Sequence, residues 1–255
     1  MGEALLKGML INKLFNRSNI TISDISSKTR KRLKNIYKVN VSGSNARAVK
    51  DSEIVLIAVK PQDVGGMLRE LFPLLKNKLV ISIAAGIKIS SIKERSGSNT
   101  IIRVMPNTPA VVSSGISAIS QTPKTKVSDL KVAEKIFGCV GEVVLMKEKY
   151  MDAITAISGS GPAYFFLLME AMIDSAVSLG IKRDLAETLV AQTALGAAIL
   201  QRNTGIRPDL LRKKVTSKGG TTEAATKIFQ AKGFNKIVAK AMQAACKRAG
   251  ELSIQ

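Results

Sequence analysis

The stretch ISGSGPAYFFLLMEAMIDSAVSLGI, residues 157–181, constrains the fold most, because it predicts one long helix that is apolar on every side. Its opening GSGP suits a tight turn with proline near the first helical position, and Gly180 suits the end of the helix. Such a helix is buried, either in a large core or between subunits. Two carboxylates one turn apart, Glu170 and Asp174, would be costly in lipid and argue against a membrane span. We therefore expect a subunit interface, with a core helix as the alternative.

Segments with the pattern of strands and of helices alternate before this helix. The apolar runs SEIVLIAVKP (52–61), LVISIAA (79–85) and TIIRVM (100–105) are typical of strands buried on both faces of a parallel sheet. Helices over 62–75 and 89–95 separate them. The alternation predicts an α/β domain with right-handed crossovers. The other predicted strands are 19–24, 39–42, 116–120 and 142–146, and the other predicted helices are 1–10, 28–36 and 126–138.

The pattern becomes entirely helical after residue 149. A chain of 255 residues, 45% of them hydrophobic, is long enough for two domains. We expect an α/β domain over 1–149 and an all-α domain over 150–255. The helices expected in the second domain, besides the apolar one, cover 150–157, 183–202 and 208–214 and begin near Thr221 and Phe234.

The sequence contains no histidine, which excludes Ser-His-Asp triads, histidine acid/base catalysis and most zinc sites. No metal site is predicted, and chemistry is left to hydroxyls, lysines, carboxylates, backbone amides or a cofactor. The two cysteines, Cys139 and Cys246, lie in ordinary apolar contexts, and no signal peptide is visible. These features predict a cytoplasmic protein without disulfides.

The formal net charge is +20, from 39 Lys+Arg against 19 Asp+Glu. Such a charge fits nucleic-acid binding, or a site that attracts anionic small molecules. The densest basic run is KTRKRLK (28–34), and aromatic residues make up only 4% of the chain, so no stacking platform accompanies the positive charge. We expect a solvated basic surface and no nucleic-acid partner. The alternatives are that the positive charge helps to bind an anionic cofactor, or that it binds nucleic acid.

The beginning of the chain fits the end of a dinucleotide-binding motif. That motif is a strand, then G-x-G-x-x-G, then a helix whose first amides hold the pyrophosphate. Gly2 stands where the third glycine would close the turn into the helix. Asp24 follows about 20 residues later, where the ribose contact falls. Alone, these two residues predict nothing; the series of strands behind them gives them weight.

Six motifs distributed over essentially all of the chain resemble the pyrroline-5-carboxylate reductase family: GEALLKGM (2–9), IAVKPQ (57–62), SIAAGI (82–87), RVMPNTPAVVSSG (103–115), ISGSGPAY (157–164) and VTSKGGTTEAA (215–225). The resemblance implies a Rossmann-like parallel sheet domain followed by an all-α dimerisation domain that also binds substrate. It implies reduction of 1-pyrroline-5-carboxylate to L-proline with NADPH or NADH, the last step of proline biosynthesis. It also implies a homodimer through the C-terminal helices, with rings of dimers common.

The resemblance places the cofactor along the AVKP and AAG stretches. Both follow apolar strands, so both lie at the carboxyl edge of the sheet, where ligands bind in open α/β folds. The resemblance also implies that Asn107, inside the irregular PNTP loop, borders the nicotinamide. Without the resemblance, Lys60 would equally well be a solvent-facing lysine and Asn107 a turn asparagine. The cofactor-binding residues predicted in this way are Gly2, Ser23, Asp24, Asn45, Ala58, Val59, Lys60, Pro61, Ala84, Ala85, Gly86 and Asn107.

For the substrate, the resemblance implies that Thr222 is catalytic and hydrogen-bonds the imine nitrogen. Gly219, Gly220 and Thr221 would cradle the substrate carboxylate, and Glu148 would lie near the bound ring. The residue types suit these roles, since consecutive glycines at a helix start let several amides converge on one anion. Alone, GGTT would be an ordinary helix cap and Glu148 a surface charge. Hydride transfer to the C=N carbon with protonation of the nitrogen requires no histidine.

The choice between the two cofactors stays open at this level. Asp24 favours a free ribose hydroxyl and so NADH, whereas Ser23, Ser26, Ser27, Lys28 and Arg30 suit a 2′-phosphate. The basic run 28–34 tips the expectation slightly towards NADPH.

The sequence departs from the family pattern at two places. The family begins with a strand and GxGxMG, and this sequence begins inside that motif, so we expect a sheet without its first strand and with exposed neighbouring edges. Either the natural start lies upstream or cofactor binding is weakened. Lys218 stands where the family usually has proline. The alternatives are a related imine or 2-hydroxy-acid reductase and an inactive homologue that acts only as a dimeric scaffold.

Overall fold

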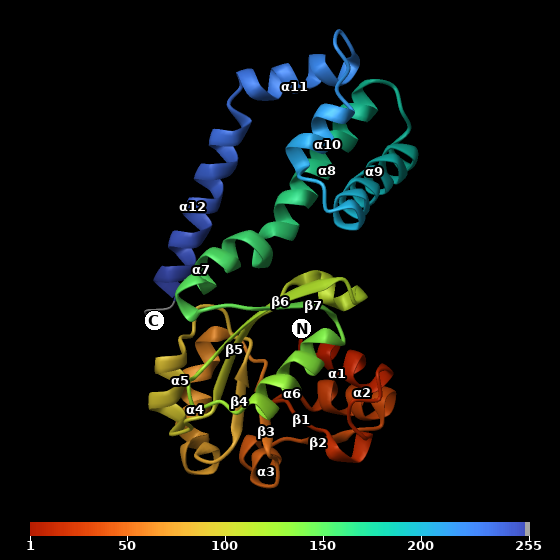
Figure 1. Cartoon of the computed structure of the whole chain (residues 1–255). Helices are drawn as coiled ribbons and strands as arrows, with labels where there is room; N and C mark the ends of the chain where they lie inside the picture. The colour runs from red at the N-terminus through yellow and green to blue at the C-terminus, as the bar shows by residue number, and fades with distance from the viewer. Residues whose placement is uncertain (253–255) are drawn as a thin grey trace. The chain divides into compact units, whose positions relative to one another are not determined.

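The computed structural model describes residues 1–252 and divides the chain into two compact units. The first, here called the sheet unit, comprises Met1–Ser160 together with the end of the chain from Ala244. The second, the helical unit, comprises Gly161–Gln243 (Figure 1). The functional division into domains 1–149 and 150–255 stays a prediction.

The sheet unit contains a five-stranded sheet in the order β3-β4-β5-β6-β7. The strands are β3 Ile54–Ile57, β4 Leu79–Ser82, β5 Ile101–Met105, β6 Gly115–Gln121 and β7 Gly141–Leu145. The neighbours β3, β4 and β5 run parallel, as the alternating pattern predicts. Strand β6 is the exception and runs antiparallel to β5. The connection between them holds only the short 3-10 turn η2, Thr108–Val112, which is too short for the crossover that a parallel neighbour needs.

Two further strands, β1 Thr21–Ser23 and β2 Asn40–Ser42, form a separate parallel pair. Within residues 1–252, β1 pairs only with β2, and β3 pairs only with β4. Each therefore keeps one edge without a partner strand, as expected for a sheet that lacks its first strand. Burial agrees: every residue of β4 is buried, whereas three of the four residues of β3 are only partly covered.

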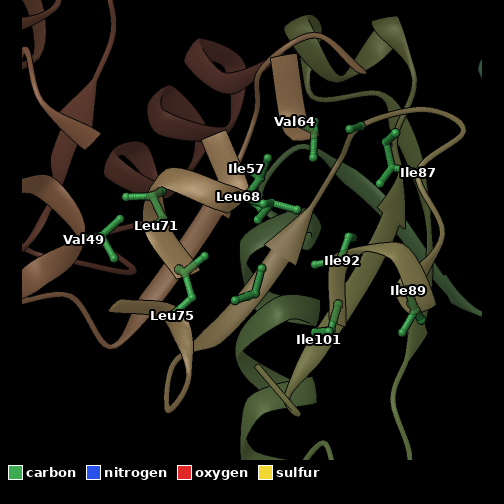
Figure 2. Packing of buried hydrophobic residues seen from close by; sticks show 12 residues of the cluster. Val49, Ile57, Val64, Leu68, Leu71, Leu75, Ile87, Ile89, Ile92 and Ile101 are labelled. Atoms are coloured by element: carbon green, nitrogen blue, oxygen red, sulfur yellow. The ribbon is translucent and has the colours of Figure 1, made fainter. Parts of the chain in front are cut away.

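Helices cover both faces of the five-stranded sheet. Side chains point alternately to opposite faces of a strand, so each strand contributes residues to two separate cores. On one face Val80 and Ile101 pack with α3 Asn45–Lys50, α4 Pro61–Leu75 and α5 Ile89–Ser96 (Figure 2). On the other face Leu79, Ile81 and Ile102 pack with α1 Gly2–Ile11 and α6 Val127–Gly138. Helix α2, Ser27–Tyr37, connects β1 to β2. The sheet is therefore double-sided, as its apolar strands predict.

The chain after β7 is helical. The turn η3 Glu148–Tyr150, helix α7 Met151–Ile154 and the π-turn η4 Thr155–Gly159 complete the first 160 residues of the sheet unit. The helices that follow are α8 Gly161–Ser178, α9 Arg183–Thr204, α10 Pro208–Lys214, α11 Thr221–Ala231 and α12 Phe234–Leu252. Helix α12 begins in the helical unit, and its last residues belong to the sheet unit.

Helix α8 is the apolar helix that the sequence predicts, but this chain does not bury it. Gly161 is its one buried residue, whereas Phe165 and Leu167 are each 67% exposed and Phe166 is 62% exposed. The run Glu148–Ser178 is long and apolar enough to cross a membrane by length and composition alone. The core helix of a soluble protein can pass the same test, but it would be mostly buried, whereas only 11% of the most apolar window is buried here. An apolar helix exposed to this degree favours the subunit interface over the core helix.

Candidate cofactor and substrate sites

The start of α1 lies against the end of β3. A Cβ atom placed on Gly2 would lie 3.2 Å from the Cβ of Ala58. These two predicted cofactor residues, which are far apart in sequence, are therefore neighbours. Ala58, Val59 and Lys60 are exposed, and Pro61 opens α4. The backbone of this stretch is therefore accessible to a ligand beside the N-terminus of α1, where the amides and the helix dipole favour an anion.

A cluster of three side chains ties α1 to α2. Arg32 donates from Nη1 to Oε1 of Glu3 at 2.7 Å, and the Tyr37 hydroxyl donates to the same oxygen at 3.0 Å. The Arg32 hydrogen bond holds the pKa of the Glu3 carboxyl below its usual value. Since β1 does not pair with β3, this cluster is one of the links that hold the β1–α2–β2 segment beside Gly2.

The residues predicted around the ribose come together at the end of β1. Ser23 donates from its hydroxyl to Oδ1 of Asn45 at 2.8 Å. Asp24 accepts from the backbone N–H of Ser26 at 2.7 Å. Arg30 donates from Nη1 to the backbone oxygens of Asp24, at 2.6 Å, and of Ile25, at 3.0 Å. A carboxylate and a guanidinium thus share one turn, and the geometry suits recognition of either a hydroxyl or a phosphate.

The AAG loop and the PNTP loop are both well packed. Gly86 has a positive φ of 78°, and a Cβ there would lie 3.1 Å from Leu252, so the loop is closed by the C-terminal end of α12. Ala84 is buried, and Ala85 is partly covered. Asn107 is 9% exposed and accepts from the Ile116 N–H at 2.9 Å, which fastens the PNTP loop to β6.

Glu148 contacts the sheet. Its Oε1 accepts from the backbone N–H of Ile89 at 2.7 Å and from Nη1 of Arg103 at 3.1 Å. Its role as a substrate contact stays a prediction. Arg103 itself was missed by the sequence reasoning, although the signal was visible: one charged residue stands inside the apolar strand TIIRVM.

The substrate loop lies in the helical unit, before α11. Gly219 has a φ of 75°, and its N–H donates to Oε2 of Glu223 at 3.0 Å. Gly220 precedes the first helical residue, Thr221. Among residues 1–252, the N–H groups of Thr221 and Thr222 and the Thr222 hydroxyl have no hydrogen-bond partner. These free donors converge at a helix start, an arrangement that suits a carboxylate.

The predicted site residues therefore form local groups: Gly2 with Ala58, Ser23 with Asn45, and the run from Gly219 to Thr222. The substrate loop belongs to the helical unit and the cofactor residues to the sheet unit. A cavity of about 510 Å³ in the sheet unit is lined by Ile89 and Thr122 and shares only Glu148 with the predicted site. The described part of the chain holds no cluster of three potential metal ligands among His, Cys, Asp and Glu.

Two family descriptions match the chain. Residues 148–252 match the family described as pyrroline-5-carboxylate reductase dimerisation. Residues 1–86 match the family described as NADP oxidoreductase, coenzyme F420-dependent. The dimerisation match begins just after β7, where the chain becomes helical, and residues 87–147 lie in neither match.

Named relatives are similar over nearly the full length. A pyrroline-5-carboxylate reductase from Arabidopsis thaliana is 39% identical over 254 residues, covering 99% of this chain and 92% of its own. One from Pseudomonas aeruginosa is 42% identical, covering 93% of this chain and 88% of its own.

Solved structures agree with these relatives. A pyrroline-5-carboxylate reductase from Coxiella burnetii has a TM-score of 0.92 at 34% identity, covering 99% of this chain and 94% of its own. The pyrroline carboxylate reductase from Plasmodium falciparum, solved with NADP bound, has a TM-score of 0.90 at 33% identity, with the same two coverages.

Proposed function

The chain belongs to the pyrroline-5-carboxylate reductase family, and from that membership we infer that it reduces 1-pyrroline-5-carboxylate to L-proline with NAD(P)H. The observation that carries this function is similarity over 99% of the chain to a relative of that name. It places the chain in the last step of proline biosynthesis. Neither a related imine or hydroxy-acid reductase nor an inactive scaffold is favoured by these comparisons.

The residues of the sheet unit fit a dinucleotide. The free N-terminus of α1 beside Ala58 offers amides and a positive dipole end to the pyrophosphate. The turn with Asp24 and Arg30 suits the ribose end, and the loops with Gly86 and Asn107 follow strands at the ligand-binding edge of the sheet. When bound, the cofactor supplies the hydride.

The helical unit supplies the substrate contacts of this proposal. The N–H groups of Thr221 and Thr222 neutralise the substrate carboxylate at the start of α11, with Gly219 and Gly220 allowing the close approach. The Thr222 hydroxyl hydrogen-bonds the ring nitrogen and orients the C=N bond, whose carbon receives the hydride while its nitrogen carries the proton. No histidine takes part.

Thr222→Ala tests this assignment. We expect kcat to fall about 10- to 100-fold, because one hydrogen bond to a charged group contributes about 1.5–3 kcal/mol. Thr222→Ser is the control and keeps most activity, since it retains the hydroxyl. The measurement is oxidation of NADPH with and without 1-pyrroline-5-carboxylate. Unchanged kinetic constants in the alanine variant would remove Thr222 from the mechanism, and a folded wild-type protein without turnover would remove the reductase function.

We propose NADPH as the preferred cofactor, with Arg30, whose guanidinium donates to the backbone oxygen of Asp24, as the cation that binds the 2′-phosphate. Arg30→Ala then raises KM for NADPH about 10-fold and leaves KM for NADH unchanged, because a guanidinium–phosphate contact is lost. Arg17→Ala, an exposed arginine on the turn η1 Arg17–Asn19, is the matched control and changes neither. An equal change for both cofactors, or a wild-type preference for NADH, contradicts the proposal.

The matched dimerisation family supports a homodimer through the helices of the 150–255 domain. We propose further that dimers assemble into a ring and that the protein works in the cytoplasm without a nucleic-acid partner. One observation supports the location: Cys139 and Cys246 are both free thiols, as is usual in reducing compartments. Light scattering of the purified protein measures the number of subunits.

A further inference from the structure

Arg103 is a buried charge in the middle of β5. The strand alternates, so that Ile102 and Val104 join the core beneath α1 and α6, while Ile101 joins the core beneath α4 and α5. Arg103 shares the face of Ile101, and its side chain is only 5% exposed. A buried guanidinium is costly unless carboxylates and hydrogen bonds compensate it, so its partners are part of the architecture.

The partners come from the segment that follows β7. Glu148 lies 3.1 Å from Nη1 of Arg103, and Asp152 lies 3.8 Å from Nη2. The same Glu148 oxygen accepts from the N–H of Ile89, the first residue of α5 and 59 positions away in sequence. Helix α5 has no side-chain cap of its own, since the preceding residue is Lys88. One carboxylate therefore caps α5 and pairs with β5 at once, and it stands at the positive end of a helix dipole.

This joint connects the AAG loop, which carries predicted cofactor residues, to the PNTP loop, whose Asn107 is expected to border the nicotinamide. The AAG loop ends at Gly86, just before α5 begins at Ile89, and β5 runs on from Arg103 into the loop with Asn107. The parallel ladder of β4 and β5 already places the two strands side by side, up to the pair Ser82–Arg103. Beyond the end of that ladder, Glu148 ties the start of α5 to β5 through its contacts with Ile89 and Arg103.

The C-terminal end of α12 closes the same region. A Cβ on Gly250 would lie 3.6 Å from Oδ2 of Asp152, and Leu252 contacts Gly86. The AAG loop is therefore held from both sides, by the cap at α5 and by the end of α12.

We propose that Arg103 and Glu148 are positioning residues that hold the AAG and PNTP loops at the spacing the nicotinamide half of the cofactor requires, without touching the substrate. The proposal rests on the proposed function for the identity of the ligand. It assigns Glu148 a different task from the substrate contact that the sequence predicts.

The test compares Glu148→Gln and Arg103→Lys with the wild-type protein, using full-length NADPH and 2′,5′-ADP, which carries only the adenosine half. We expect NADPH affinity and kcat to fall about 10-fold while 2′,5′-ADP affinity stays unchanged, because only one half of the site loses its spacing. The kinetic isotope effect with 4-deuterated NADPH rises, because hydride transfer becomes slower. Arg207→Lys, in an exposed pair with Asp209, is the control and changes none of these values.

Three outcomes overturn the proposal. A raised KM for the substrate with unchanged NADPH affinity shows that Glu148 is a direct substrate contact. An equal loss of affinity for NADPH and for 2′,5′-ADP shows that the ion pair only stabilises the fold. Variants identical to the wild type show that the joint has no role.

Hydrogen exchange separates this proposal from the proposed function. Faster exchange at the amide of Ile89 and in the AAG loop of Glu148→Gln supports the joint even if the wild-type protein proves inactive, and unchanged exchange counts against it. If the wild-type protein is inactive but hydrogen exchange is faster in Glu148→Gln, only the reductase function is contradicted.

Discussion

Gly141→Ala is expected to prevent stable folding, lowering the free energy of unfolding by more than about 4 kcal/mol. Gly141 opens β7 with a φ of 149°, a conformation that residues with a side chain rarely adopt. A Cβ at this position would lie 1.9 Å from the backbone oxygen of Gly115, the residue that Gly141 faces across the β6–β7 ladder. Neither backbone can move away without breaking the pairing of these two strands.

Gly138→Ala is the matched control, three residues earlier. Gly138 lies in the last turn of α6, and a Cβ there would meet nothing within 4 Å. Alanine at a helical position stabilises by up to about 1 kcal/mol relative to glycine. Urea unfolding followed by circular dichroism measures both variants. A Gly141→Ala protein with the urea midpoint of the wild type would contradict this prediction, because it would show that the β6–β7 pairing accommodates the added Cβ atom.

The double substitution Phe165→Glu with Leu167→Glu is expected to convert the dimer to monomers, weakening association at least about 100-fold. Both side chains are 67% exposed on α8, within the region that matches the dimerisation family. A glutamate in an apolar interface leaves an unpaired charge without water, at a cost of several kcal/mol, and also removes aromatic contact area.

The control for this experiment is Val127→Glu. Val127 is 70% exposed, about as much as Phe165 and Leu167, but it opens α6 in the sheet unit. Because Val127 lies outside the region that matches the dimerisation family, we expect this variant to leave the dimer intact. Sedimentation velocity over a dilution series measures the dissociation constants. A glutamate variant that sediments as a dimer at every concentration would show that the subunit contact does not depend on these two positions of α8.

The sequence alone was sufficient for the order and kind of the elements. Periods of two and of 3.6 residues are local signals, as are a proline at a helix start and a glycine after its end. Helix α10 begins and ends where the pattern predicts, and α8 is apolar on every side as expected. The six motifs led to the correct family, and the incomplete glycine motif predicted the open edges of β1 and β3.

The tertiary structure decided the features that join distant parts of the chain. No local pattern states that β6 turns back against β5, that Glu148 reaches the first amide of α5, or that Gly141 meets the backbone of Gly115. Periodicity shows which face of an element is apolar, but not which neighbour covers it. Strand direction, the partner of a buried charge and the room for a Cβ atom depend on segments brought together only when the cores on both sides of the sheet are packed.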